Sequence, residues 1–220
     1  MWSQGLPFAG DQRSFRSLSY ECAGKRTFDV GFALLLLPLA GLVILLLWLG
    51  VRCDGGPGFF GHWRVGRNGQ LFRCWKLRTM VVDAEERLAA HLRADPDAAE
   101  EWRREFKLRN DPRVTPLGRF LRRTSLDELP QVWNVLCGDM SFVGPRPIVT
   151  RELDHYGEAA TRCFSVRPGL TGVWQVSGRN DVTYDERVRM DLDYVSGMSL
   201  ARDVRVILRT ESVVLARTGR

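Results

Sequence analysis

A chain of 220 residues is long enough to bury a substantial core as one domain with an appendage. It carries 32 Lys and Arg against 26 Asp and Glu, and this net charge of +6 fits a nucleic acid, an anionic membrane face or a phosphorylated substrate. The five cysteines are scattered and none forms a C-x-x-C pair, which argues against a disulfide framework or a zinc site and favours a reducing compartment.

A long apolar run lies between Asp29 and Arg52, and its roughly 22 uncharged residues are enough for a helix to cross a hydrocarbon layer of about 30 Å. A buried core helix is the alternative, but such helices seldom stay uncharged over this length. The sequence therefore predicts a membrane segment over residues 25–54, a basic segment before it, 1–24, and a separate domain after it, 55–220.

The orientation of the membrane segment is left open by its flanks. Lysines and arginines lie on both sides of it, so the positive-inside rule gives no direction. Pro38 lies in the first half of the run and predicts a kink, because proline removes a helical hydrogen bond. A helix bent near mid-depth returns to the face it entered, which satisfies both basic flanks. We therefore expect a re-entrant hairpin bent at Pro38, with a kinked spanning helix as the alternative.

The residues after the membrane segment predict a small β-hairpin followed by charged helices. Residues 59–66 and 70–79 have the pattern of two strands around Asn68-Gly69, a dipeptide favoured in tight turns. An amphipathic helix is expected over residues 83–91, and a second charged helix is expected from Pro96 to about residue 109. Because both helices carry dense charge of both signs, we interpret them as solvated surfaces without a catalytic role.

The C-terminal half predicts further helices and one glycine-rich loop. Apolar residues within 117–121 repeat at helical spacing, and another helix is expected within 128–138. Residues 167–180 predict a loop where the backbone approaches a ligand closely. Residues 200–209 predict a basic amphipathic helix that lies either on a membrane surface or on the core. The expected fold class is α+β and mainly helical, with a small hairpin and surface amphipathic helices.

The stretch from Arg122 to Pro130 places two adjacent carboxylates, Asp127 and Glu128, beside arginines. Adjacent like charges repel, so this pattern is difficult to explain as scaffolding and suits a site for phosphate and a divalent metal. The alternative is a capping box in which Glu128 reaches back to Ser125. Pro130 favours Asp127 as the N-cap, because the proline then falls in the first helical turn. The helix dipole would keep Asp127 ionised there, as a nucleophile or metal ligand must be.

Several cations are candidates for binding phosphate. Arg146 lies between two prolines, which fix the direction in which it points. Arg122 and Arg123 immediately precede the carboxylates, so we expect at least one of them to point into the site, with simple surface charge as the alternative. Lys76 and Arg78 lie on the second predicted strand and are further candidates.

Short motifs occur in the order that one family shows, from Lys25 to the C-terminal end. They are Lys25-Arg26-x-x-Asp29, Lys76-Leu77-Arg78-Thr79-Met80, Asp111-Pro112-Arg113-Val114-Thr115, Ser125-Leu126-Asp127-Glu128-Leu129-Pro130-Gln131, Gly138-Asp139-Met140-Ser141, Val143-Gly144-Pro145-Arg146-Pro147 and Arg167-Pro168-Gly169-Leu170-Thr171-Gly172. Together they resemble the bacterial sugar transferases, the monotopic polyprenyl-phosphate phosphoglycosyl transferases. Within this family the chain is most similar to the short exopolysaccharide-initiating members, and the later stretch Trp174-Gln175-Val176-Ser177-Gly178-Arg179-Asn180-Asp181 strengthens that assignment.

The resemblance implies an enzyme that moves a hexose 1-phosphate from a UDP-sugar to undecaprenyl phosphate at the cytoplasmic face of the bacterial inner membrane and releases UMP. Asp127 maps onto the family's nucleophile, which is expected to form a covalent phosphosugar intermediate. Glu128 maps onto the family's glutamate, and the two carboxylates are the expected Mg²⁺ ligands. The cationic candidates for phosphate or substrate binding in the matching motifs are Lys76, Arg78, Arg113, Arg122, Arg123, Arg146 and Arg167.

Some expectations stay open at this point. The family's membrane helix breaks at a Ser-Pro pair, but Leu37 precedes Pro38 here, so the proline alone must make the bend. No residue identifies the sugar, and galactose is the first choice with glucose second. The oligomeric state is open between a monomer and a homodimer paired through the apolar segment. A non-catalytic membrane scaffold that binds anionic lipid is the alternative function, and no nucleic acid is expected as a partner.

Overall fold

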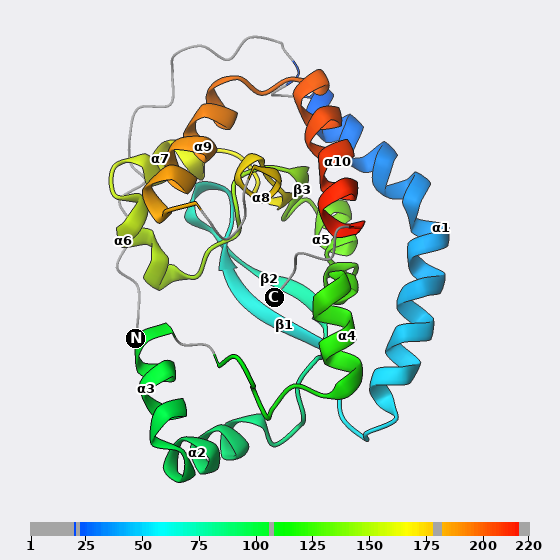
Figure 1. Cartoon of the computed structure of the whole chain (residues 1–220). Helices are drawn as coiled ribbons and strands as arrows, with labels where there is room; N and C mark the ends of the chain where they lie inside the picture. The colour runs from blue at the N-terminus through cyan, green and yellow to red at the C-terminus, as the bar shows by residue number, and fades with distance from the viewer. Residues whose placement is uncertain (1–19, 21–22, 106–107, 178–181, 216–220) are drawn as a thin grey trace.

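A computed structural model of the chain describes residue 20 and residues 23–105, 108–177 and 182–215. The fold is α+β and mainly helical, as the sequence predicts, with helices around one small hairpin (Figure 1). The helices are α1 Gly24–Arg52, α2 Ala84–Ala94, α3 Pro96–Glu105, α4 Pro116–Thr124, α5 Gln131–Cys137, α6 Leu153–Tyr156, α7 Ala159–Cys163, α8 Val173–Val176, α9 Tyr184–Ser196 and α10 Leu200–Leu215. The strands are β1 Phe59–Val65, β2 Leu71–Leu77, β3 Ser141–Val143 and β4 Gly169–Thr171, and short 3-10 turns lie at η1 Arg67–Gly69, η2 Leu126–Glu128 and η3 Thr150–Glu152.

The apolar segment forms one helix, α1, which is long and apolar enough to cross a membrane by length and composition. Pro38 lies inside this helix, and Figure 1 shows the ribbon changing direction along its length without folding into a tight hairpin. Leu35 and Leu39 are 75% and 67% exposed, so the middle of α1 presents a bare apolar surface. Such a surface is typical of contact with lipid rather than water.

Both ends of α1 pack against the same globular body. Near the N-terminal end, the Lys25 ammonium lies 2.6 Å from a carboxylate oxygen of Asp203 on α10. One turn later, Asp29 accepts hydrogen bonds from the hydroxyl of Ser141 and the backbone N–H of Phe142. At the C-terminal end, Val51 belongs to a buried cluster with Leu77 and Leu121. The apolar middle of α1 is therefore flanked by two anchored ends.

The predicted β-hairpin is confirmed as an antiparallel pair, β1 and β2, with Phe59 opposite Leu77 and Val65 opposite Leu71. Its connection is a 3-10 turn in which Asn68 adopts a left-handed conformation with φ of 54°. Asparagine tolerates the left-handed region better than most residues, because its short side-chain amide can form hydrogen bonds with the nearby backbone. Alternation along β1 places residues 60, 62 and 64 on one face of the strand.

The glycine-rich segment predicted as a loop contains a short strand and a helical turn. β4 pairs in parallel with β3, and α8 follows β4 after Gly172. The prediction of a loop over 167–180 was wrong for residues 169–176, because the pairing partner of β4 lies far away in the sequence. Residues 178–181, which contain the Gly178-Arg179-Asn180 motif, lie outside the described part of the chain.

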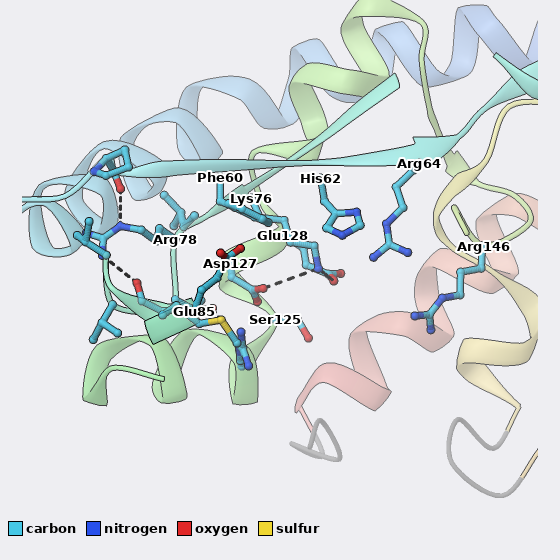
Figure 2. A pocket seen from close by; sticks show the side chains of 18 of the residues that line it. Phe60, His62, Arg64, Lys76, Arg78, Glu85, Ser125, Asp127, Glu128 and Arg146 are labelled. Atoms are coloured by element: carbon cyan, nitrogen blue, oxygen red, sulfur yellow. Dashed lines mark hydrogen bonds and ion pairs between the residues drawn. The ribbon is translucent and has the colours of Figure 1, made fainter. Parts of the chain in front are cut away.

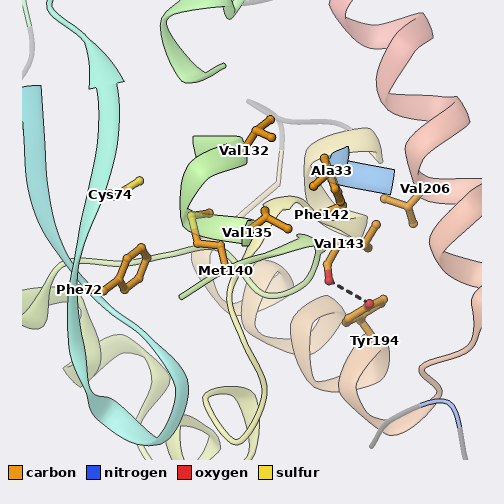
Figure 3. Close-up of a cluster of buried hydrophobic side chains, with 10 residues drawn as sticks. All are labelled: Ala33, Phe72, Cys74, Val132, Val135, Met140, Phe142, Val143, Tyr194 and Val206. Carbon is orange, nitrogen blue, oxygen red and sulfur yellow. Dashed lines mark hydrogen bonds between the residues drawn. The ribbon is translucent and has the colours of Figure 1, made fainter. Parts of the chain in front are cut away.

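The main hydrophobic core lies where α5, β3, α9 and α10 meet the hairpin and α1 (Figure 3). Met140, Phe142 and Val143 are buried in it, and the hydroxyl oxygen of Tyr194 on α9 lies 3.1 Å from the carbonyl oxygen of Val143. On α10, Val206 is buried in this core, while Leu208 is 59% exposed on another face. The alternative in which the C-terminal helix packs on the core is therefore confirmed, and an apolar face remains uncovered.

Candidate active site

The adjacent carboxylates lie in the connection between α4 and α5. Thr115 caps α4, because its hydroxyl accepts the backbone N–H of Gly118, and Ser125 ends the helix in a left-handed conformation with φ of 57°. The 3-10 turn η2 then carries Asp127, and Pro130 precedes the first residue of α5. The proline thus sits at a helix start, as predicted. Asp127 is not an N-cap, however, and the Ser125 side chain makes no capping hydrogen bond.

Asp127 is buried, with 7% of its surface exposed, whereas Glu128 is half-buried beside it. The Lys76 ammonium contacts both residues, at 2.6 Å from a Glu128 oxygen and 3.9 Å from an Asp127 oxygen (Figure 2). Burial raises the pKa of Asp127 to about 6, with Glu128 adding to the rise and Lys76 and Arg122 opposing it. Asp127 does not occupy the N-cap position on which the expected effect of the helix dipole rested, and desolvation outweighs the nearby positive charges. A carboxyl with this pKa is still mostly ionised at neutral pH, as the sequence predicts.

Arg122 reaches the carboxylates from the last turn of α4. Its Nε donates a hydrogen bond to the hydroxyl of Thr79, at 2.9 Å. The close approach of α4 to that backbone requires glycine at position 118, because a Cβ there would lie 2.1 Å from the Thr79 carbonyl oxygen. Burial lowers the pKa of the Arg122 guanidinium, and the charge of Asp127 opposes that shift. The prediction that one of the paired arginines points into the site holds for Arg122, while Arg123 is exposed and does not line the cavity.

A cavity of about 870 Å³ surrounds the carboxylates. That volume suits an extended ligand the size of a nucleotide sugar, since small-molecule sites span about 300–1,000 Å³. Figure 2 shows His62 and Arg64 between the carboxylates and Arg146. Both come from the face of β1 that lines the cavity, and the alternation of Phe60, His62 and Arg64 along the strand is the sequence signal that could have identified them. Other lining residues that sequence reasoning missed are Asp83, Glu85, Glu86, Trp174, Gln175 and Arg187.

Arg146 enters the cavity from the segment after β3, as its two flanking prolines suggest. Its guanidinium carbon lies 5.4 Å from the ring centre of Trp174. Its backbone N–H donates to the carboxylate of Asp191 on α9, which also accepts a hydrogen bond from Tyr156 at 2.9 Å. Burial raises the pKa of Asp191 to about 7. Arg146 is thus held through its backbone, which leaves the guanidinium facing the cavity.

The other predicted cations lie away from the carboxylates or bind other groups of the protein. Arg78 lines the cavity, but its guanidinium binds Asp54 and the carbonyl oxygens of Val51, Pro57 and Met80, so it clamps the end of α1 to the end of β2. Arg113 pairs with Asp111 at 2.6 Å, outside the cavity lining. Arg167 donates to the carbonyl oxygen of Gly138 and lines a second, much smaller cavity. Arg78, Arg113 and Arg167 thus have protein partners in this structure, and their binding of phosphate stays a prediction.

Asp127 and Glu128 are adjacent carboxylates that line this cavity, as are Glu85 and Glu86 of α2, and no cluster of three or more metal-ligating side chains occurs in the described part of the chain. A magnesium ion does not need such a cluster, because it commonly keeps several waters and binds one or two carboxylates together with substrate phosphates. The donor set therefore fits a Mg²⁺ shared with a diphosphate, and it does not fit a metal caged by protein alone.

Comparison with known proteins bears on this site. The model of the bacterial sugar transferase family matches residues 20–217. The chain is 52% identical over 195 residues to the undecaprenyl-phosphate galactose phosphotransferase of Salmonella typhimurium. The aligned residues make up 89% of this chain and 41% of that protein. It is 49% identical to the exopolysaccharide production protein ExoY of Rhizobium meliloti, over 89% of this chain and 87% of the relative.

A third relative is the UDP-glucose:undecaprenyl-phosphate glucose-1-phosphate transferase of Caulobacter vibrioides, which is 42% identical over 84% of this chain and 67% of its own length. The chain thus spans about two fifths of the length of the Salmonella relative and most of the length of ExoY. The family match extends over nearly every described residue, including both carboxylates, the cations of the cavity and helix α1. This chain belongs to the bacterial sugar transferase family.

Proposed function

We propose that the protein transfers a hexose 1-phosphate from a UDP-sugar to undecaprenyl phosphate and releases UMP, as the first step of exopolysaccharide synthesis. The observation that carries this proposal is a buried carboxylate, Asp127, in a cavity that Lys76, Arg122 and Arg146 also line and that adjoins the end of an exposed apolar helix. The names of three relatives, which include an undecaprenyl-phosphate galactose phosphotransferase and a glucose-1-phosphate transferase, support the reaction class.

Asp127 is the proposed nucleophile. In the first step, a carboxylate oxygen attacks the phosphorus that bears the sugar, and the bond from that phosphorus to the bridging oxygen breaks. UMP leaves with the bridging oxygen and its electron pair, and an aspartyl phosphosugar remains. In the second step, a phosphate oxygen of the lipid attacks the same phosphorus and frees the Asp127 carboxylate. The product is a lipid-linked diphosphosugar, and ping-pong kinetics are expected.

The charges around Asp127 suit both steps. Lys76 and Arg122 flank the nucleophile, and their positive charge stabilises the negative charge that builds up on the transferred phosphoryl oxygens. Glu128 holds the Lys76 ammonium at 2.6 Å and thereby fixes its position. When bound by Asp127 and Glu128, Mg²⁺ would neutralise diphosphate charge that otherwise repels a carboxylate.

The lipid acceptor is proposed to enter at the end of the cavity nearest to α1. That end carries Pro57, Phe60 and Val82, of which Phe60 and Val82 are 52% and 66% exposed. Arg78 connects the same end to α1 by donating to the Val51 carbonyl oxygen. An apolar entrance beside a lipid-facing helix lets a polyprenyl chain stay in the membrane while its phosphate reaches Asp127.

Helix α1 is proposed to be re-entrant. Its two ends are anchored to one globular body, through Asp203 near one end and Leu77 near the other, so a full span would require that body on both sides of the bilayer. We infer that the protein enters the cytoplasmic leaflet of the bacterial inner membrane, because nucleotide sugars and free thiols both belong to the reducing cytoplasm. The described cysteines, at positions 53, 74, 137 and 163, are all free.

Galactose is the proposed sugar, with glucose second. Two of the relatives, from Salmonella typhimurium and Erwinia amylovora, carry galactose in their names at 52% and 50% identity, and the glucose-named relative is 42% identical. The test is a panel of UDP-sugars with undecaprenyl phosphate and Mg²⁺, using protein in nanodiscs. We expect UMP release that depends on the lipid and is fastest with UDP-galactose. A folded protein that releases no UMP from any donor would contradict the proposed reaction.

The pH dependence of the first step follows from the raised pKa of Asp127, which is about 6. Only the ionised carboxylate attacks, so kcat/KM for the donor should rise with pH through about 6 and level off above it. Below pH 6 we expect kcat/KM for the donor to fall roughly tenfold for each pH unit. Initial rates measured across the range, with thermal melting at each pH as a control for unfolding, check this. A rate that stays flat through pH 6 would show that Asp127 does not limit the reaction.

A further inference from the structure

Three buried polar atoms have no hydrogen-bond partner among the residues that the structure describes, and all three belong to side chains that line the active-site cavity. They are Nε1 of Trp174, Oε1 of Gln175 and Nε of Arg187. Buried polar groups are normally paired, and leaving one unpaired costs about 1–3 kcal/mol. Three such atoms in one part of the cavity indicate a place that a polar ligand completes.

The position of these side chains follows from the parallel pair of strands. Arg146 leaves the carboxyl end of β3, and Trp174 leaves the carboxyl end of the neighbouring β4. In sheets with parallel strands, ligands bind outside the carboxyl ends. The two segments are tightly apposed, because a Cβ on Gly172 would lie 2.6 Å from the Gly144 carbonyl oxygen. The guanidinium of Arg187, from α9, lies 4.8 Å from the Trp174 ring centre, so it completes the same corner.

The three unpaired atoms combine two donors with one acceptor. The Trp174 and Arg187 nitrogens are donors, and the Gln175 amide oxygen is an acceptor. The Watson–Crick edge of uracil presents the complementary set, because O2 and O4 accept and N3–H donates. Cytosine presents the same two acceptors and one donor in another order, because its O2 and N3 accept and its exocyclic amine donates. Selection of uracil therefore requires the Gln175 oxygen to face N3, between the two donors. We propose that this corner binds the uracil of the nucleotide donor, with Trp174, Gln175 and Arg187 as the residues that select the base. This inference rests on the proposed function, since it assumes a UDP-sugar.

The charges between this corner and the nucleophile agree with that placement. Figure 2 shows Arg64 between the carboxylates and Arg146, and the Arg146 guanidinium carbon lies 5.4 Å from the ring centre of Trp174 in the corner. Burial and the nearby charge of Arg146 lower the pKa of Arg64, and the charges of Glu152 and Glu128 oppose that shift. A nucleoside in the corner brings its diphosphate to these guanidiniums and its hexosyl phosphate towards Asp127. The apolar end near α1 is then left for the lipid.

The test measures nucleotide binding by the full chain in nanodiscs with Mg²⁺, using isothermal titration with UMP, N3-methyl-UMP and CMP. We expect wild-type protein to bind both analogues at least about tenfold more weakly than UMP, since each disrupts a buried hydrogen bond. Gln175→Leu should bind UMP about tenfold more weakly than wild type and lose the preference for UMP over N3-methyl-UMP. Gln70→Leu, at an exposed position outside the cavity lining, is the matched control and should keep the wild-type preference.

Two results would overturn the base-binding site. One is wild-type protein that binds N3-methyl-UMP as tightly as UMP, which needs no variant to fold. The other is Gln175→Leu protein with unchanged UMP affinity but an altered preference among UDP-sugars, which would assign the corner to the sugar. The same preparations are assayed for lipid-dependent transfer. Transfer without base discrimination would remove this site and leave the proposed function, whereas UMP-selective binding without transfer would support the site and remove the function.

Discussion

Replacing Asp127 with asparagine should reduce lipid-dependent UMP release by at least about 10³-fold, because the amide cannot form the covalent phosphosugar intermediate. The same change should stabilise the fold. Burial raises the pKa of Asp127 from 3.8 to about 6, so the ionised carboxylate costs folding free energy at neutral pH. Each unit corresponds to about 1.36 kcal/mol, which sets an upper limit on the order of 3 kcal/mol.

The sign of that effect follows from linkage. A carboxyl whose folded-state pKa lies above its unfolded value binds its proton more tightly when folded, so stability falls as pH rises from 3.8 through about 6. An asparagine side chain does not ionise, so the variant avoids this loss of stability as the pH rises. We therefore expect its melting temperature at pH 7 to lie several degrees above that of the wild type. Asp97→Asn, on exposed α3, is the control and should change neither turnover nor melting. Asp127→Asn protein that retains turnover would show that another group is the nucleophile.

Replacing Asp203 with asparagine should lower the free energy of unfolding by about 3–5 kcal/mol, because it leaves the Lys25 ammonium buried without its counter-charge. Asp203 is fully buried and accepts hydrogen bonds of 2.6 Å from Lys25, Tyr20 and Tyr194. This network joins the start of α1 to α9 and α10. The change should therefore loosen the N-terminal end of α1 from the globular body, and the melting temperature in nanodiscs should fall by roughly 10 °C.

Asp193→Asn is the matched control for Asp203. Asp193 forms an ion pair with Arg202, but its side chain is 74% exposed. Exposed pairs contribute about 1 kcal/mol or less, so this variant should melt within a few degrees of wild type. Equal melting temperatures for the two variants would mean that the buried network does not secure α1, and the anchoring of its N-terminal end would then rest on Asp29 and the apolar contacts.

The carboxylate pair shows how far local sequence signals reach. Pro130 indicated correctly that a helix begins beside it, because a missing backbone N–H is tolerated only in the first turn. The same reasoning made Asp127 the N-cap, and this was wrong because Ser125 ends α4 in a left-handed conformation and a 3-10 turn intervenes. The environment of Asp127 depends on packing, so its raised pKa was not predictable from its neighbours in sequence.

The cations show the same division. Sequence motifs identified Lys76, Arg122 and Arg146, and the structure brings all three to one cavity. They also suggested Arg78 and Arg113, whose guanidiniums are occupied by Asp54 and Asp111. A sequence shows that an arginine is present but not which carboxylate it meets after folding. Arg78 meets Asp54, which lies 24 residues earlier in the chain, because the end of α1 packs against the end of β2.

The sequence by itself determined the long apolar helix, the hairpin, the approximate positions of α2, α3, α4, α5 and α10, and the paired carboxylates, because each depends on spacing, composition or turn chemistry within a few residues. It did not predict α6, α7, α8 or α9. Only the tertiary structure decided that both ends of α1 return to one body and that β3 and β4 pair in parallel. It also decided that Trp174, Gln175 and Arg187 line the cavity with Asp127. These features depend on contacts between segments distant in the chain, and burial within those contacts sets the charge state of the site.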